Sequence, residues 1–170
     1  MKILGGRYKG LNIDTSKKIS YRPTQTRIRK SIFDILRPFV YLRVLDLYSG
    51  SGILGFESAS RGADSITFIE SQSAVVKMLI RNKNKFESSN FSINRKKVDV
   101  FLDNIKESYD LIFADPPYDG IDYDLLMNRC IEKLAKNGKL IVEMRNSSFS
   151  FNGSIEKKYG DTKILIYENI

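Results

Sequence analysis

The sequence predicts an α/β protein whose sheet is mostly parallel and doubly wound. Short apolar runs bounded by turn residues alternate along the chain with segments whose apolar residues recur at helical spacing. Glycine-rich and proline-rich turns directly follow two of the predicted strands. A content of 42% hydrophobic and 28% charged residues over 170 positions is typical of one globular domain with a sizeable core.

The predicted elements follow one another as strand, helix, strand from residue 42 onward. The strands are expected at 44–47, 66–69, 91–98, 109–114 and 139–143, and the helices at 53–61, 71–86 and 123–135. Two short strands at 154–158 and 163–168 should close the chain as a hairpin, which makes one of them antiparallel to the rest. We assign no role to residues 145–153.

The amino-terminal quarter of the chain carries the excess positive charge. Residues 1–43 have a net charge of +9, whereas the remaining 127 residues have a net charge of −1. Glycines and alternation predict a hairpin within 2–22, and apolar spacing predicts a helix at 25–36. We therefore divide the chain into a basic extension, 1–41, and a core, 42–170, and favour nucleic-acid binding over a merely solvated basic face. The residues expected to contact the nucleic acid are Arg7, Lys9, Arg22, Arg27, Arg29 and Lys30.

A glycine-rich loop at 46–52 joins the first strand of the core to a helix. Its glycines allow a ligand to approach the backbone, and the pattern from Gly50 to Gly55 also fits a dinucleotide-binding turn. Asp46 would repel a pyrophosphate, but it suits the ammonium group of S-adenosylmethionine. We therefore favour this cofactor over a dinucleotide or an unliganded turn. The loop residues expected to contact the cofactor are Asp46, Tyr48, Ser49, Gly50 and Gly52.

Two further carboxylates are expected at the ends of the next two strands. Glu70 follows the second strand, where it can accept hydrogen bonds from both ribose hydroxyls or, alternatively, cap the following helix. Asp99 is expected to end the third strand and to accept a hydrogen bond from the adenine amine, unless it caps a short helix. Together with Asp46, these residues favour the ligand interpretation.

Asp115-Pro116-Pro117-Tyr118 follows the strand at 109–114, at the carboxyl edge of the sheet where ligands of open α/β sheets bind. The prolines fix φ and remove two backbone donors, so this 115–118 loop is rigid and rich in acceptors. If the Asp115 carboxylate and the Pro116 carbonyl each accept an N–H from a nucleobase amine, the nitrogen lone pair can point at the donor methyl. Asp115 is also expected to contact the cofactor. Tyr118 can stack on the extruded base. A simple Pro-Pro turn is the alternative.

The composition restricts the chemistry further. The chain has no histidine, which excludes catalysis that depends on an imidazole and zinc sites ligated by histidine. Displacement at a sulfonium methyl depends on positioning more than on a strong base. The aspartates after the 115–118 loop suit the start of a helix, so we expect no metal.

These segments together resemble the RsmD-type methyltransferases, which methylate N2 of a guanine in 16S rRNA of the small ribosomal subunit. The most specific part is the amino-terminal block at 2–10, with Arg22-Pro23-Thr24 and 31–36. The resemblance implies a seven-stranded Rossmann-like fold with an amino-terminal extension, S-adenosylmethionine as cofactor, and action on assembled or assembling small subunits. Tyr48 stands where phenylalanine is more usual.

Other functions and the cellular setting also follow from the sequence. Because the same loop serves several base amines, an adenine-N6 methyltransferase acting on DNA or RNA is the main alternative. A non-catalytic RNA-binding assembly factor and an NAD oxidoreductase are the others. The chain has one cysteine, Cys130, and no apolar run near the roughly 20 residues that a membrane span needs. Since the amino terminus does not resemble a secretory signal, we expect a cytoplasmic protein. We also expect it to be a monomer.

Overall fold

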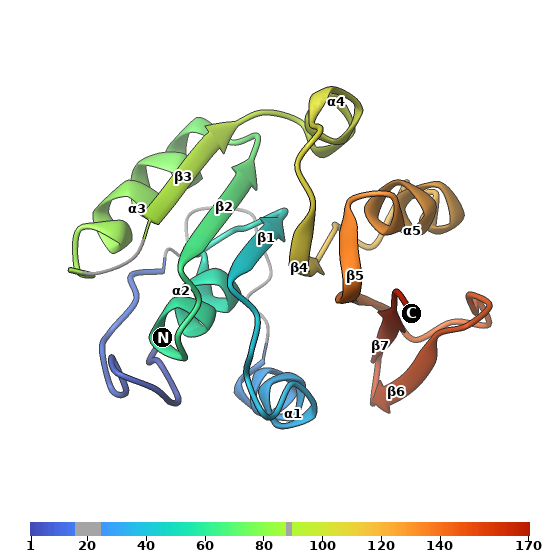
Figure 1. The fold of residues 1–170 in the computed structure, drawn as a ribbon, viewed down its shortest axis with the longest axis horizontal. Coiled ribbons are helices and arrows are strands. Elements are labelled where there is room, and N and C mark those ends of the chain that lie inside the picture. The colour runs from blue at the N-terminus through green and yellow to red at the C-terminus, as the bar shows by residue number, and fades with distance from the viewer. Residues whose placement is uncertain (16–24, 88–89) are drawn as a thin grey trace.

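The computed structural model describes residues 1–15, 25–87 and 90–170 (Figure 1). Its strands are β1 Arg43–Leu47, β2 Ser65–Glu70, β3 Asn90–Arg95, β4 Tyr109–Ala114, β5 Leu134–Arg145, β6 Ile155–Tyr159 and β7 Thr162–Glu168. Its helices are α1 Thr26–Ile35, α2 Ile53–Ser60, α3 Ser73–Lys83, α4 Val98–Asn104 and α5 Tyr123–Ile131. Over the described residues these elements confirm the predicted alternation of strands and helices.

One seven-stranded sheet organises these described elements, in the order β3-β2-β1-β4-β5-β7-β6. Strands β1 to β5 pair in parallel, and β7 is antiparallel to both β5 and β6. The predicted mostly parallel, Rossmann-like α/β fold is therefore confirmed, including the late antiparallel strand. The carboxyl ends of the parallel strands meet at one edge of the sheet, which we call the carboxyl edge; the opposite edge is the amino edge.

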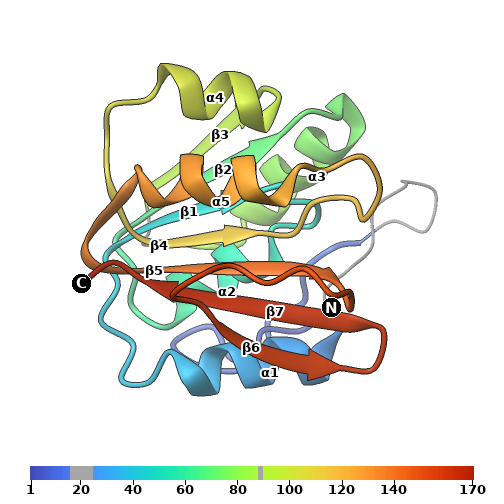
Figure 2. The same cartoon turned by 90° about the vertical axis from the view of Figure 1, so that its right-hand side faces the viewer.

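Helices cover both faces of the sheet. An apolar cluster on one face joins the amino-terminal segment, α1, α2 and α3 to the sheet, and a second cluster on the other face joins α4 and α5 to it. Figure 2 shows α5 and α1 on opposite sides of β4 and β5. Cys130 of α5 lies in the second cluster with no exposed surface, and burial raises the pKa of its thiol to about 12. Within the described part of the chain, no helix is long and apolar enough to cross a membrane.

The predicted bounds differ from the structure mainly around α4 and β5. The strand expected at 91–98 ends at Arg95, and α4 begins at Val98, because Val98, Phe101 and Leu102 bury one face at helical spacing. Asp99 therefore lies in the first turn of a helix. The prediction that Asp99 ends the third strand is wrong. Strand β5 begins at Leu134 rather than at 139, with an irregular register opposite the start of β4.

The amino-terminal segment packs on the core as a narrow loop closed by one antiparallel bridge, Lys2 to Asn12, rather than as a hairpin of two strands. A buried carboxylate and a buried guanidinium anchor this loop. Glu57 of α2 accepts a hydrogen bond from the Leu4 amide at 2.7 Å, and Arg29 of α1 donates to the Lys2 carbonyl at 2.8 Å. Because the extension shares the apolar cluster of the sheet, the division at residue 41 stays a prediction about function.

Candidate active site

Loops at the carboxyl edge enclose a cavity of about 630 Å³. They follow β1, β2 and β4, and the last residue of β5 completes the wall. The predicted residues that line this cavity are Asp46, Tyr48, Ser49, Gly50, Glu70, Asp115, Pro116, Pro117 and Tyr118. The topology thus brings the glycine loop and the 115–118 loop together, as expected from adjacent parallel strands.

The glycine loop turns sharply after β1. Tyr48 has a φ of 55° and Gly50 a φ of 54°, and a left-handed conformation at a residue as large as Tyr48 is typical of functional sites. Gly52 has a φ of 77°, but it is absent from the residues that line the cavity. A Cβ on Gly52 would lie 2.6 Å from side-chain atoms of Phe56 and Leu79, so this glycine permits close packing of α2 and α3. The predicted cofactor contact of Gly52 is therefore not supported.

Asp46 is buried beneath the loop. One carboxylate oxygen, Oδ2, accepts a hydrogen bond from the Gly55 amide at 3.0 Å. Burial raises the pKa of Asp46 to about 8; the Gly55 hydrogen bond opposes this shift, and the nearby Glu70 carboxylate adds to it. A buried carboxyl of this kind is stabilised in its ionised form by a cationic ligand. The position therefore suits an ammonium group.

Glu70 ends β2 and holds the loop through both of its oxygens. Its Oε2 accepts a hydrogen bond from the Gly50 amide at 3.2 Å, and its Oε1 accepts one from the Gln72 amide at 2.8 Å. Each carboxylate oxygen can accept a further hydrogen bond, so both remain suited to a pair of ribose hydroxyls. The Ser49 hydroxyl, in contrast, donates to the Asp46 carbonyl at 2.6 Å and braces the turn itself.

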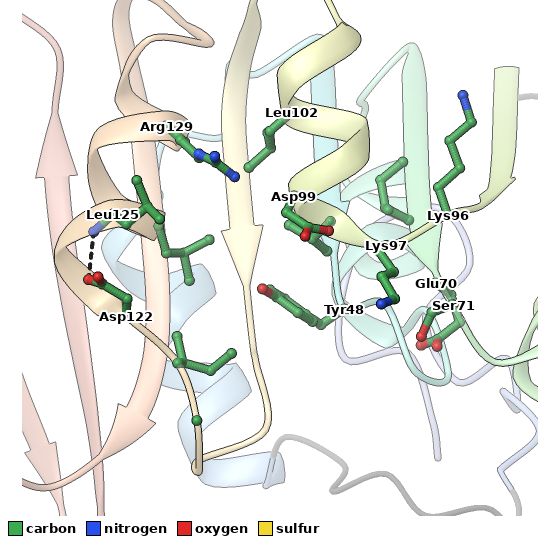
Figure 3. A pocket seen from close by; sticks show the side chains of 15 residues that line it. Tyr48, Glu70, Ser71, Lys96, Lys97, Asp99, Leu102, Asp122, Leu125 and Arg129 are labelled. Atoms are coloured by element: carbon green, nitrogen blue, oxygen red, sulfur yellow. Dashed lines mark hydrogen bonds between the residues drawn. The ribbon is translucent and has the colours of Figure 1, made fainter.

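A second cavity of about 400 Å³ adjoins the first, and Tyr48, Glu70 and Ser71 line both. In Figure 3 the Tyr48 ring and the Asp99 carboxylate point into this space from the β1 loop and from α4. The lining is mixed: Leu102, Leu125 and Leu126 are among its apolar side chains, and Lys96, Lys97, Asp122 and Arg129 also line it. The apolar side chains and the Tyr48 ring suit a flat apolar group, the Asp99 carboxylate suits an amine on its edge, and Glu70 lies where the two cavities meet.

The side chain of Tyr118 is held from two sides. Its hydroxyl forms a hydrogen bond of 2.9 Å with the hydroxyl of Thr162, the first residue of β7. The guanidinium carbon of Arg145 lies 5.5 Å from the centroid of its ring. Neither Thr162 nor Arg145 was predicted, because no local motif marks them and both contacts join residues far apart in the sequence.

The basic residues predicted to bind nucleic acid do not form one surface. Arg27 and Lys30 are exposed on α1, next to Ser31, whose hydroxyl contacts the Tyr159 hydroxyl at the carboxyl edge. Arg7 and Lys9 are also exposed, but they lie at the amino edge. There the Arg7 amide donates to the carbonyl of Ser60, the last residue of α2, at 2.7 Å.

Arg29 was predicted to contact nucleic acid, and the structure contradicts this. Its side chain is 1% exposed and donates to the Lys2 carbonyl, so it anchors the amino-terminal loop instead. Arg22 lies outside the described residues. Within the described residues, no group of three or more acidic, cysteine or histidine side chains could hold a metal ion.

Comparison with known proteins places this fold and site in a family. A family model described as "Conserved hypothetical protein 95" matches residues 1–168. The chain belongs to this family. Ribosomal RNA small subunit methyltransferase D of Buchnera aphidicola subsp. Baizongia pistaciae is 33% identical over 142 residues, which cover 82% of this chain and 70% of that protein. The resemblance to RsmD-type proteins is therefore confirmed.

Other relatives agree with this assignment. The protein of the same name from Escherichia coli K12 is 32% identical over 119 residues, which cover 69% of this chain and 60% of that protein. The chain thus spans about three fifths of the length of this relative. The solved structure of the putative methyltransferase yhhF from Escherichia coli has a TM-score of 0.87 and 27% identity, covering 99% of this chain and 97% of that one.

Proposed function

We propose that this protein is an S-adenosylmethionine-dependent methyltransferase that modifies the exocyclic N2 amine of a guanine in 16S rRNA. The observation that carries this proposal is the meeting of three carboxylates, Asp46, Glu70 and Asp115, around one cavity next to a rigid Pro-Pro loop. The names of the family relatives support ribosomal RNA of the small subunit as the substrate. The guanine N2 position rests on the resemblance to RsmD-type enzymes.

The cavities fit the proposed cofactor part by part. The Asp46 carboxylate would bind the ammonium group, and Glu70, where the two cavities meet, would accept hydrogen bonds from the ribose hydroxyls. The second cavity would hold the adenine, with Asp99 accepting a hydrogen bond from its amine and Tyr48 beside the ring. When bound, this cofactor supplies a methyl group on a positively charged sulfur.

The 115–118 loop would position the substrate amine. Asp115 and the Pro116 carbonyl would each accept one N–H, which aligns the nitrogen lone pair with the methyl group, and the Tyr118 ring would stack on the extruded base. As the amine gains a methyl group it loses a proton, and the Asp115 carboxylate is placed to accept it. Orientation alone can supply on the order of 7–11 kcal/mol in such a site, so the lack of histidine is no obstacle.

A direct test uses small ribosomal subunits from cells that lack the gene. The purified protein should transfer methyl groups from labelled S-adenosylmethionine to one guanine of the 16S rRNA, mapped by mass spectrometry, and intact subunits should be compared with naked rRNA. Unchanged N2-methylguanosine at every 16S site in those cells would contradict the proposal. Methylated adenine as the product would favour the adenine-N6 alternative.

The non-catalytic alternative makes a different prediction. An RNA-binding assembly factor that retains the fold need not bind the cofactor, so calorimetry with S-adenosylmethionine separates the two functions. Absence of binding at millimolar ligand would favour the assembly factor. Displacement of S-adenosylmethionine by NAD would favour the oxidoreductase. We also propose that the protein acts in the cytoplasm, which cell fractionation tests, and that it is a monomer, which sedimentation of the purified protein tests.

A further inference from the structure

Arg145, the last residue of β5, lies at the mouth of the large cavity. Of the described residues that line this cavity, it alone carries a positive charge, whereas Asp46, Glu70, Asp115 and Asp119 carry carboxyl groups. An RNA strand that brings a base to this opening must pass these acidic groups. A cation at the mouth offsets their repulsion of the phosphates.

The contacts of Arg145 leave its hydrogen-bond donors accessible. Its guanidinium carbon lies over the Tyr118 ring, 5.5 Å from the centroid, which is a cation–π contact. Among the described residues it forms an ion pair with Asp119 at 3.9 Å, which joins side chains that are 63% and 94% exposed. An exposed pair of this length is weak, so a phosphate can replace Asp119. The planar guanidinium can then donate two parallel hydrogen bonds to phosphate oxygens.

A series of contacts also joins Arg145, beside the proposed position of the substrate base, to α1, which carries the exposed basic residues Arg27 and Lys30. It pairs in register with Thr162, whose hydroxyl holds Tyr118. The next residue, Asn146, donates a hydrogen bond of 3.0 Å to the Gly160 carbonyl in the turn between β6 and β7. Tyr159, which begins that turn, contacts Ser31 of α1 through its hydroxyl. An RNA strand bound along the exposed basic residues of α1 would therefore pass Arg145 before it reaches Tyr118.

We propose that Arg145 binds the RNA phosphate adjoining the nucleotide whose base stacks on Tyr118, and that it holds the Tyr118 ring in place for that base. This inference rests on the proposed function of the same site. It makes Arg145 a substrate-binding residue and a positioning residue for Tyr118. The other anion that could reach the mouth is the carboxylate of the cofactor, and the experiment must distinguish these two partners.

The test compares Arg145→Gln and Arg145→Lys with a matched control, Arg43→Gln. Arg43 is also about half exposed and paired with an aspartate, Asp110 at 3.6 Å, but it lies at the amino edge. For each protein, methyl transfer to small subunits from cells lacking the gene gives kcat and KM over a range of salt concentrations. Calorimetry gives the dissociation constant of S-adenosylmethionine, and thermal unfolding confirms that each variant folds.

Loss of one phosphate contact predicts a defined pattern. Arg145→Gln should raise KM about tenfold and reduce the slope of log KM against log salt by about one. Cofactor affinity and Tm should stay unchanged. Arg145→Lys should keep the salt slope, because the charge remains, but lower kcat, because a lysine cannot stack as a plane on Tyr118. Arg43→Gln should behave as the unmodified protein.

Two results would overturn the inference. One is an unchanged KM and salt slope in Arg145→Gln; the other is an equal loss of cofactor affinity, which would assign Arg145 to the cofactor carboxylate. If the unmodified protein transfers no methyl group, the proposed function fails instead. The salt dependence of equilibrium binding of the same proteins to the same subunits then still tests the phosphate contact.

Discussion

Two aspartates lie near the ends of β4, Asp110 within the strand and Asp115 directly after it, and their carboxylates have different surroundings. At the amino edge, Asp110 accepts hydrogen bonds from the Leu42 and Arg43 amides at 3.1 and 2.8 Å and pairs with the Arg43 guanidinium. At the carboxyl edge, Asp115 faces a cavity of about 630 Å³. The same residue type therefore joins neighbouring elements at the start of β4 and lines a ligand-sized space just after its end.

This contrast extends to the elements beside β4. At the amino edge, hydrogen bonds between protein groups join the amino-terminal loop to α2 and the start of β4 to residues 42–43. At the carboxyl edge, the loops after β1, β2 and β4 surround open space. We therefore expect substitutions at the amino edge to affect mainly stability and those at the carboxyl edge to affect mainly activity.

The largest expected effect is on stability, from Glu57→Ala. Glu57 has no exposed side-chain surface, binds the Leu4 amide and forms an ion pair of 2.7 Å with Arg61. Removing the carboxylate leaves the Arg61 charge largely buried without this partner, so the free energy of unfolding should fall by about 3–5 kcal/mol. Urea denaturation measures this change, and Glu132→Ala, at an exposed position after α5, is the control. A loss no larger than that of the control would break the contrast between the edges.

At the carboxyl edge, Asp115→Asn should reduce kcat by about a hundredfold to a thousandfold, because the site loses the charge that orients the substrate amine and accepts its proton. Cofactor affinity should stay nearly intact, since Asp46 and Glu70 are the residues proposed to hold the cofactor. The matched control is Asp110→Asn near the other end of β4, which should retain kcat and lose stability. A joint loss of turnover and cofactor binding in Asp115→Asn would contradict this division of roles.

The sequence predicted the candidate site residues that lie at or near the ends of strands. Asp46, Glu70 and Asp115 each follow or end an apolar run, and parallel topology then brings such residues to one edge. Arg29 was misjudged because it lies at the border of the apolar stripe of α1. Its burial depends on Lys2 and on other groups distant in the sequence that pack over it.

Arg145 was missed for a related reason. It ends a long strand without any motif, and its contact with Tyr118 joins residues that only the order of β4, β5 and β7 brings together. Asp99 was placed at the wrong kind of element, because Val98 begins a new helix instead of continuing β3. Local pattern therefore predicts the elements and the loop residues, whereas contacts made across the sheet require its three-dimensional arrangement.

Asp46, at the carboxyl edge, should make the free energy of unfolding depend on pH. The folded state raises the pKa of Asp46 from 3.8 to about 8, so between these values only the folded state holds the proton. Because the folded state then binds more protons than the unfolded state, the free energy of unfolding falls as pH rises. Asp46→Asn keeps an oxygen for the Gly55 amide and removes this dependence. Its Tm relative to the unmodified protein should therefore increase from pH 5 to pH 8.

The same variant should bind the cofactor less tightly. Loss of a charge-assisted hydrogen bond to the ammonium group weakens binding by about 1.5–3 kcal/mol. In the unmodified protein the ammonium ionises Asp46, so binding at neutral pH should release a proton, which calorimetry in buffers of different ionisation enthalpy detects. Unchanged proton release in Asp46→Asn, or a Tm difference independent of pH, would contradict the role of Asp46.

The smallest expected effect separates the basic residues of the two edges. Arg27 and Lys30 lie on α1, which contacts Tyr159 at the turn between β6 and β7 through Ser31. Arg7 and Lys9 lie at the opposite edge. Arg27→Ala with Lys30→Ala should weaken binding to small subunits about tenfold and flatten its salt dependence, because two phosphate contacts close to the target base are lost. Arg7→Ala with Lys9→Ala removes the same charge far from the base, so its effect should be smaller. Equilibrium binding at several salt concentrations measures both double variants. Equal losses of affinity would mean that the RNA contacts both edges. The functional contrast between the edges would then not extend to the substrate.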